Sequence, residues 1–283
     1  MISSVYRHLK LLINLKEVHG FEVSIIFTDK NFSMKIKPVF ILLAPILLFS
    51  FKGDSFKKEQ LKFATVRTAY NEKWAVVKEK LSKSGVDTTN FEIFIRVFKQ
   101  DAKLEVWAKS KNIAQYRLVE NYTICESSGE LGPKRKQGDG QVPEGFYHVS
   151  GFNPASAFYL SLGVSYPNES DLIKCGGAKA NPGGDIMIHG NCVTIGCMPL
   201  TDDKIKEVYV MAVEARNHGQ QTIPIHIFPT ELTAQGMAKL KSLTSDTTKL
   251  HFWNNLQTGY DYFETNKLLP KISVVKNGDY KVE

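Results

Sequence analysis

A chain of 283 residues can form one large domain or two modest ones and can bury a substantial core. Apolar residues make up 43% of it and charged residues 23%, which excludes a wholly disordered chain. The formal net charge is +7, but residues 1–53 carry seven Lys/Arg against three Asp/Glu, which leaves 29 basic and 26 acidic side chains elsewhere. Because that remainder has no basic stripe interleaved with aromatic residues, a nucleic-acid partner is not expected.

Residues 34–55 predict export of the protein. Lys35 and Lys37 form a short positive region, and the apolar run that follows, residues 39–51, is thirteen residues long. A helix that spans a bilayer needs about 20 apolar residues, so this run is short for a permanent anchor and suits the core of a signal peptide. Pro45 in its middle argues against a buried core helix. Because no clear small-residue cleavage site follows, an uncleaved anchor is the competing interpretation.

The position of this segment is unusual, because 33 residues precede Met34 whereas a signal peptide belongs at an N-terminus. We therefore expect Met34 to be the functional start. Residues 1–33 would be a non-native upstream extension, and residues 34–53 the signal peptide or N-terminal anchor. Export would place the protein in the periplasm or cell envelope, where disulfides can form among its four cysteines. A membrane would be a partner only if the segment stays uncleaved.

A helical segment is predicted for residues 54–89. Four apolar residues recur there at helical spacing: Tyr70, Trp74, Val77 and Leu81. Gly85 can end the helix. The stripe indicates packing against a core rather than a binding function.

From residue 90 the apolar period changes to two, which predicts strands. The predicted strands are 91–98, 103–108, 116–124, 146–149, 158–162, 185–189 and 222–228. The first three follow one another at short spacing, so we expect an antiparallel meander. Thr201 and two early acidic residues predict the start of a helix that ends at Gly219. Segments rich in Gly and Pro between these elements are predicted loops.

The C-terminal segment, residues 231–283, predicts two further helices, at about 231–243 and 249–264, and a hairpin at Asn277-Gly278. The chain is therefore predicted to be mainly β with peripheral helices. Its central part, residues 90–230, would be the principal domain, and the C-terminal extension would pack on it.

The stretch IMIHGNCVTIGCMPLTDD, residues 186–203, concentrates the reactive side chains. His189, Cys192 and Cys197 could belong to a zinc site, but structural zinc needs four ligands, usually in two close pairs, and no second pair occurs in the sequence. Cys192 and Cys197 could instead form a disulfide, or Cys197 could be a small buried residue. The remaining alternative is a cysteine nucleophile beside its base.

Nucleophilic catalysis accounts for the most features of this stretch. A thiol reacts as the thiolate, so it needs a nearby base, and His189 at the end of a predicted strand can provide one. Gly196 lets the backbone approach the reacting atoms without a side chain between them. The backbone amides of Ile195, Gly196 and Cys197 could then point at one spot, which is the arrangement of an oxyanion hole.

The same stretch resembles the signature of the L,D-transpeptidase (YkuD-type) catalytic domain, in which His-Gly precedes Ser/Thr-x-Gly-Cys. In this chain the matching residues are His189-Gly190 and Thr194-Ile195-Gly196-Cys197. The upstream GDGQVPEGFYHV is similar to the Pro-x-Gly-x-[FY] strand entry of that family. SLGVSYPN, GYDYFE and SVVKNGDY resemble a branch that includes the periplasmic enzyme cutting Braun's lipoprotein from peptidoglycan. The resemblance covers residues 90–283.

This resemblance implies an L,D-transpeptidase-type β-sandwich for residues 90–230, with the cysteine in a groove, and peptidoglycan stem peptides as substrates. Cys197 would attack the carbonyl after the third residue of the stem and form a thioester. His189 would take up and return the proton, with its ring oriented by the Gly190 carbonyl. An amine acceptor would give a cross-link, and water would give hydrolysis, for example the release of a peptidoglycan-linked lipoprotein. No cofactor or metal is implied.

The chain departs from the family pattern at two points. The stretch between His189 and Cys197 has seven residues, whereas it is usually considerably longer. Ile195 stands where many members have His or Arg. The first departure shortens a loop beside the substrate, and the second removes a polar group beside the thiol. A wall-binding module with a dead site is the non-enzymatic alternative, and the intact His/Cys pair argues against it.

Residues outside the His/Cys pair are also expected to contact the substrate. Thr194, Tyr166 and Asn168 would line the groove. Arg135, in the basic run 134–136, could meet the acidic stem peptide. A solvated charge run is the favoured interpretation of these three basic residues.

Overall fold

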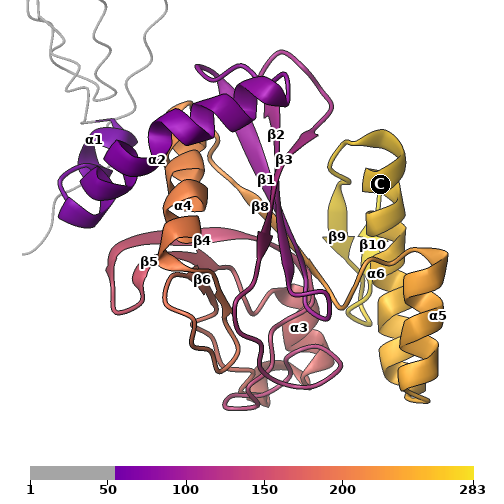
Figure 1. The fold of residues 1–283 in the computed structure, drawn as a ribbon. Coiled ribbons are helices and arrows are strands. Elements are labelled where there is room, and N and C mark those ends of the chain that lie inside the picture. The colour runs from indigo at the N-terminus through magenta and orange to yellow at the C-terminus, as the bar shows by residue number, and fades with distance from the viewer. Residues whose placement is uncertain (1–54) are drawn as a thin grey trace, which may run out of the picture. The chain divides into compact units, whose positions relative to one another are not determined.

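The computed structural model describes residues 55–283, which lie within one compact unit. Residues 1–33 and 34–53, predicted to be an upstream extension and a signal peptide or anchor, lie outside the described residues. In the part that the structure describes, no helix is both long enough and apolar enough to cross a membrane. Figure 1 shows helices at both ends of this part and a strand-rich centre.

One sheet of eight strands forms the centre of the fold, in the order β3-β2-β1-β8-β4-β5-β6-β7. Its strands are β1 (Phe91–Phe98), β2 (Lys103–Ser110), β3 (Arg117–Thr123), β4 (Gly145–Ser156), β5 (Tyr159–Val164), β6 (Met187–His189), β7 (Met198–Pro199) and β8 (Pro224–Phe228). The sheet curls because the long strand β4 pairs at its start with β8 and farther along with β5, where its register shifts. The predicted mainly β fold with peripheral helices is confirmed.

The first three strands form the predicted antiparallel meander. In addition, β1 pairs in parallel with β8, which joins segments more than a hundred residues apart and was not predicted. Nearly every residue of β1 is buried, because helices cover both faces of the sheet at this place. Continuous burial of this kind is typical of central strands packed on both sides.

Three helices cover one face of the sheet (Figure 1): α1 (Phe56–Gln60), α2 (Ala64–Lys83) and α4 (Asp202–Asn217). The single helix predicted for the N-terminal segment is two helices, because Phe63 has an extended backbone conformation with φ −87° and ψ 135°. Val77 and Leu81 are fully buried in the main core cluster, together with Ile205 and Val208 of α4. The predicted apolar stripe is therefore a packing surface.

The opposite face is covered by α5 (Ala234–Leu243) and α6 (Thr247–Asn266), followed by the hairpin of β9 (Ile272–Val274) and β10 (Tyr280–Val282). These elements confirm the helices and the hairpin predicted for the C-terminal extension. Phe98 and Phe228 of the sheet share a second core cluster with Trp253 and Leu256 of α6. The Trp253 indole donates a hydrogen bond of 2.8 Å to Glu144 Oε2, just before β4.

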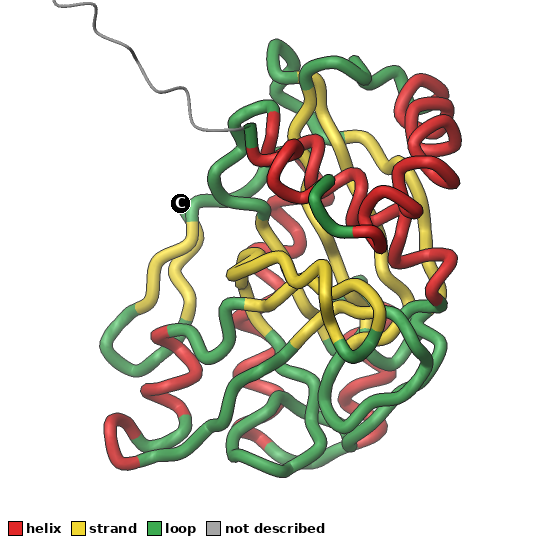
Figure 2. The backbone as a smooth tube through the Cα atoms, turned by 90° about the vertical axis from the view of Figure 1, so that its left-hand side faces the viewer, coloured by secondary structure: helices red, strands yellow, loops and turns green. Residues whose placement is uncertain are grey.

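The helix α3 (Glu169–Lys174) lies in a segment predicted to be a loop, so that prediction is wrong. Asn168 and Asp171 form a reciprocal capping box that starts it. The Ser170 hydroxyl donates to the carbonyl of Gly278, and Lys174 pairs with Asp279 at 2.7 Å, so α3 is attached to the C-terminal hairpin. A short 3-10 helix, Gly177–Lys179, follows. Figure 2 shows long loops, drawn in green, around the strands.

Candidate active site

Two short neighbouring strands position the predicted base and nucleophile. His189 is the last residue of β6, and its register partner on β7 is Pro199. Cys197 immediately precedes β7, whose first residue, Met198, pairs with Ile188. The two strands run parallel, so the residues between His189 and Cys197 cross from the end of β6 back to the start of β7, and Cys197 stands just before the β7 partner of Ile188, on the strand beside His189. We call residues 190–197 the nucleophile link.

His189 is held in one orientation. Its Nδ1 lies 2.5 Å from the carbonyl oxygen of Gly190, so Nδ1 carries the proton and donates, which leaves Nε2 as the basic nitrogen. The Phe158 ring lies against the imidazole with a centroid distance of 4.7 Å. Burial lowers the pKa of His189, and the hydrogen bond to Gly190 opposes that shift. The imidazole is consequently neutral, and able to accept a proton, at neutral pH.

Cys197 is a free, half-buried thiol. Its Sγ lies 3.7 Å from the carbonyl oxygen of Asp185, to which the S–H group can donate. Burial raises the pKa of the Cys197 thiol, while a hydrogen bond with the Met187 backbone and the charge of Lys134 act in the opposite direction. The resting thiol is therefore protonated and requires a base before it can act as a nucleophile.

Two of the three amides predicted to form an oxyanion hole converge on one atom. The amides of Gly196 and Cys197 donate to the Thr194 hydroxyl at 3.1 and 2.8 Å, and this hydroxyl donates to the Cys197 carbonyl at 2.8 Å. The structure thus puts a side-chain oxygen where both N–H groups point. The Ile195 side chain is 88% exposed.

Both glycines of the motif occupy places that a larger residue would not fit. Gly196 has a φ of +132°, and an added Cβ would lie 2.9 Å from the carbonyl oxygen of Gln141. At Gly190 an added Cβ would lie 2.6 Å from Asp202 Oδ1 and 3.0 Å from the carbonyl oxygen of Phe158. Asp202 Oδ1 accepts a hydrogen bond of 2.8 Å from the Asn191 amide, so the first turn of α4 fixes the start of the nucleophile link.

A disulfide joins Cys192, inside the nucleophile link, to Cys125 at the end of β3. This pairing excludes a disulfide between Cys192 and Cys197. It also excludes a zinc site that uses Cys192, because an oxidised cysteine is not a thiolate ligand. Cys175 is the second free cysteine. Sequence spacing left the connectivity open, since four cysteines allow three pairings.

The basic run 134–136 is not a solvated charge run, so that interpretation is wrong. Lys134 is 4% exposed, and its ammonium group donates to Asp139 Oδ1 at 2.7 Å. Arg135 pairs with the buried Asp171 at 2.9 Å and lies over the Phe252 ring. The guanidinium of Arg135 is therefore engaged within the protein, and of the three residues only Lys136 is exposed.

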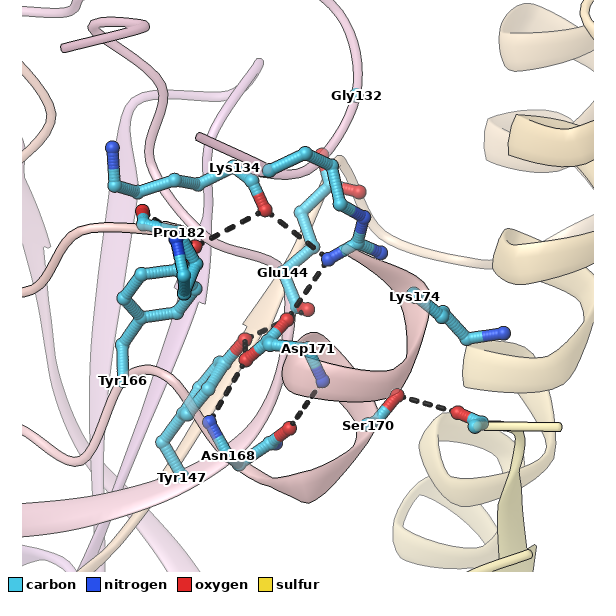
Figure 3. A network of polar contacts seen from close by, with 12 residues as sticks. Gly132, Lys134, Glu144, Tyr147, Tyr166, Asn168, Ser170, Asp171, Lys174 and Pro182 are labelled. Atoms are coloured by element: carbon cyan, nitrogen blue, oxygen red, sulfur yellow. Dashed lines mark hydrogen bonds and ion pairs between the residues drawn. The ribbon is translucent and has the colours of Figure 1, made fainter. Parts of the chain in front are cut away.

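Tyr166 and Asn168, predicted to line a substrate groove, belong to the same polar network (Figure 3). The buried Tyr166 hydroxyl donates to the carbonyl of Pro182 at 3.2 Å. Asn168 caps α3, and its side-chain amide donates to the Phe146 carbonyl and to the Tyr280 hydroxyl. Because these contacts use the polar atoms of both residues, the structure supports a framework role for them rather than a place in the groove.

Several residues around the site were not identified from the sequence. Phe158, Asp185 and Asp202 contact the His/Cys pair or the nucleophile link. Phe158 reaches it from the turn between β4 and β5, whereas Asp185 and Asp202 flank the motif in the sequence. Asp202 was interpreted as part of a helix start, which it is; its contact with Asn191 is an additional role. No spacing pattern indicated the other two.

Comparisons with known proteins identify the family. The YkuD model, described as the L,D-transpeptidase catalytic domain, matches residues 92–227. A protein of Escherichia coli K12 with the name "Putative L,D-transpeptidase YafK" is 37% identical over 192 residues, which cover 67% of this chain and 73% of that protein. Its counterpart from Escherichia coli O157:H7 matches equally.

Two solved structures also match at 18% identity. The helical cell shape determining protein Pgp2 from Campylobacter jejuni has a TM-score of 0.40, with 70% of this chain and 80% of that chain covered. Bd1075 from Bdellovibrio bacteriovorus has a TM-score of 0.36, with coverages of 68% and 82%. The sequence relatives and the matched family model, together with the His-Gly and Gly-Cys residues of the site, establish that this chain belongs to the L,D-transpeptidase (YkuD) family.

Proposed function

We propose that the protein is a cysteine-dependent L,D-transpeptidase that acts on peptidoglycan stem peptides through a thioester intermediate, in cross-linking or remodelling of the cell wall. The observation that carries the proposal is the placement of His189 and Cys197 on neighbouring parallel strands, with the imidazole oriented through Nδ1 by the Gly190 carbonyl. Family membership supports the substrate class.

In this mechanism Nε2 of His189 takes the proton from Cys197 Sγ, and the thiolate attacks the carbonyl carbon that follows the third residue of the stem peptide. The carbon–nitrogen bond breaks, the imidazolium returns its proton to the leaving amine, and a thioester remains on Cys197. An acceptor amine then attacks the thioester and loses a proton to His189. The products are a new amide and the regenerated thiol.

The charge of the tetrahedral intermediate would be held by the amides of Ile195, Gly196 and Cys197. Two of them now donate to the Thr194 hydroxyl, which marks the spot where N–H groups converge. The substrate oxygen would take this place when the Thr194 side chain rotates away. Preorganised donors of this kind stabilise developing charge more than they stabilise the ground state.

The pKa values of Cys197 and His189 are shifted in opposite directions, which fits a proton transfer that occurs together with attack on the substrate. Burial raises the pKa of Cys197 and lowers that of His189, so in the resting state both the thiol and the imidazole are neutral. Proton transfer would accompany attack on the substrate. The thiol is thereby protected from unproductive reactions until a carbonyl is in place.

Hydrolysis of the same bond is the second candidate. The nucleophile link is short, and Asn191, Val193 and Ile195 are exposed along it, which would leave the acceptor side of the thioester open to water. An enzyme that makes cross-links gains from excluding water there. The hydrolase would release a departing amine, for example that of a lipoprotein attached to peptidoglycan.

Mass spectrometry of products distinguishes the two activities. Tetrapeptide muropeptides and, separately, a peptidoglycan–lipoprotein conjugate are incubated with the protein and with Cys197→Ala. Dimers linked between two third-position residues support transpeptidation, whereas released lipoprotein with an intact tripeptide supports hydrolysis. If neither substrate changes while a carbapenem-type probe acylates Cys197, the peptidoglycan assignment is wrong. Absence of acylation as well would favour a non-catalytic wall-binding module.

We also propose export, with Met34 as the functional start. The short positive region and apolar run at residues 35–51 support it. N-terminal sequencing of the protein isolated from the cell envelope tests this proposal, and peptides from residues 1–33 in the cellular protein would contradict it.

A further inference from the structure

The nucleophile link is exposed, and much of its hydrogen bonding is internal. Asn191, Cys192, Val193 and Ile195 are exposed. The bonds that shape its second half join Thr194 to the amides and carbonyl within the same four residues. Outward hydrogen-bonding contacts include Asn191 to Asp202 at its start and a 3.5 Å approach between the hydroxyls of Thr194 and Ser128. Such a segment needs an additional restraint to keep the Cys197 thiol at a fixed position relative to His189.

That restraint is the disulfide between Cys125 and Cys192. Cys125 follows β3, and the amide of the preceding Ile124 donates to the Ala102 carbonyl at 2.7 Å, so the Cys125 end of the disulfide is attached to the turn between β1 and β2. The Cys125 amide also donates to the carbonyl of Pro199 at 3.0 Å. Pro199 is the β7 residue paired with His189.

These contacts close a ring around the nucleophile. From Cys192 the chain runs through Cys197 to Pro199, then crosses by a hydrogen bond to Cys125, and returns through the sulfur–sulfur bond to Cys192. The base lies on the neighbouring strand. A bond that closes such a ring restricts how far the thiol can move relative to the imidazole.

We infer that Cys125 and Cys192 are positioning residues: their disulfide holds Cys197 within reach of His189, so turnover depends on the bridge being formed. This inference rests on the proposed function of Cys197 as nucleophile. Opening the bridge would free the exposed link, let Sγ move away from Nε2 and increase the exposure of the thiol. A displacement of about 1 Å can lower a catalytic rate on the order of 10²-fold.

The decisive comparison is the full-length double variant Cys125→Ser/Cys192→Ser against wild type, with Cys175→Ser as the matched control. We expect kcat on the muropeptide substrate to fall about ten- to hundredfold while KM changes little. Peptide-resolved alkylation of Cys197 by iodoacetamide, measured against pH, should have a lower midpoint, because the thiol is less buried. Cys175→Ser should match wild type in both measurements. A double variant with wild-type kcat and alkylation profile, and only a lower Tm, would overturn the inference.

A second measurement applies even if the double variant does not fold. The wild-type protein is reduced with a phosphine at low temperature, and its fold is followed by circular dichroism. Turnover should fall as mass spectrometry shows the Cys125–Cys192 bridge opening, and full turnover after complete reduction would refute the positioning role. The alkylation profile requires no peptidoglycan. If it shifts while no stem peptide is processed, the positioning role stands and the substrate assignment fails.

Discussion

Replacing Gly190 with alanine is expected to impair the base while leaving the nucleophile chemically intact. The backbone of Gly190 does not require a left-handed conformation, so the effect comes from contacts alone. The added Cβ would lie 2.6 Å from Asp202 Oδ1, 3.0 Å from the carbonyl oxygen of Phe158 and 3.1 Å from Ile205 Cγ2. The carbonyl of Phe158 and the buried Ile205 cannot move easily, so the link itself must shift.

The expected loss of stability has two parts. Overpacking of a filled site costs about 1–3 kcal/mol. If the Asp202 carboxylate rotates away to relieve its contact, the Asn191 amide loses its acceptor, which costs about 0.5–1.5 kcal/mol. The free energy of unfolding should therefore fall by about 2–4 kcal/mol, which for a domain of this size lowers Tm by about 5–15 °C. Because the Gly190 carbonyl orients His189, kcat should fall by about 10²-fold.

Calorimetry gives the Tm change, and steady-state kinetics well below Tm give kcat. Gly151→Ala is the matched control, because an added Cβ there has no neighbour within 4 Å. Alkylation of Cys197 at alkaline pH, where the thiolate forms without a base, should be the same as in wild type. A Gly190→Ala protein with the expected Tm loss but an unchanged kcat would refute the link between the Gly190 carbonyl and the orientation of His189.

Three further predictions concern the nucleophile, the base and the polar network. Cys197→Ala should abolish acylation by a carbapenem-type probe and turnover while circular dichroism and Tm stay near wild type; labelling that persists at another cysteine would reassign the nucleophile. Because burial lowers the pKa of His189, the acid limb of kcat/KM should lie below the ordinary histidine value of about 6.5, and a limb above it would contradict a desolvated base. Arg135→Met should lower the free energy of unfolding by about 3–5 kcal/mol, because it leaves the buried Asp171 without its cation, and a normal Tm with a raised KM would instead indicate substrate binding.

The contacts of the C-terminal hairpin predict an acid-sensitive stability. Lys174, His251 and Asn277 hold the pKa of Asp279 down at about 2, against the desolvation that raises it. A depressed carboxyl pKa contributes stability above the unfolded value of about 3.9 and loses it as pH falls toward 2. Asp279→Asn should therefore be less stable than wild type at pH 7, and the difference should shrink between about pH 4 and 2. A difference independent of pH would exclude the ionic contribution.

Local patterns predicted most of the fold because the elements have clear apolar periods. The strand 91–98 was found in this way, and the hairpin was found from its Asn277-Gly278 turn. The parallel pairing of β1 with β8 was not, since a pairing across more than a hundred residues leaves no local signal. The helix α3 was missed because its start depends on a capping box between Asn168 and Asp171 in a segment rich in turn residues.

The candidate site likewise has residues that a local sequence pattern indicates and residues whose contacts depend on the fold. The His-Gly and Gly-Cys residues are close in sequence, so their signature alone pointed to His189 and Cys197 as the proposed base and nucleophile. The burial of Lys134 and Arg135 depends on Asp139 and Asp171, and no charge pattern distinguishes a solvated run from one neutralised by partners that only the fold brings near. The pairing of Cys125 with Cys192 depends likewise on where β3 ends.

The attachment of the C-terminal extension has a consequence for how the chain can be divided. The family model ends at residue 227, yet the Glu144 carboxylate just before β4 accepts from Trp253, and the cap of α3 donates to Tyr280. A fragment cut at residue 230 would expose Phe98 and Phe228, which α6 covers in the intact protein. The buried Glu144 carboxylate would also lose the hydrogen bond that it accepts from Trp253. The domain that the family model matches and the folding unit therefore differ: the model covers residues 92–227, but the core of this protein is completed by residues 231–283.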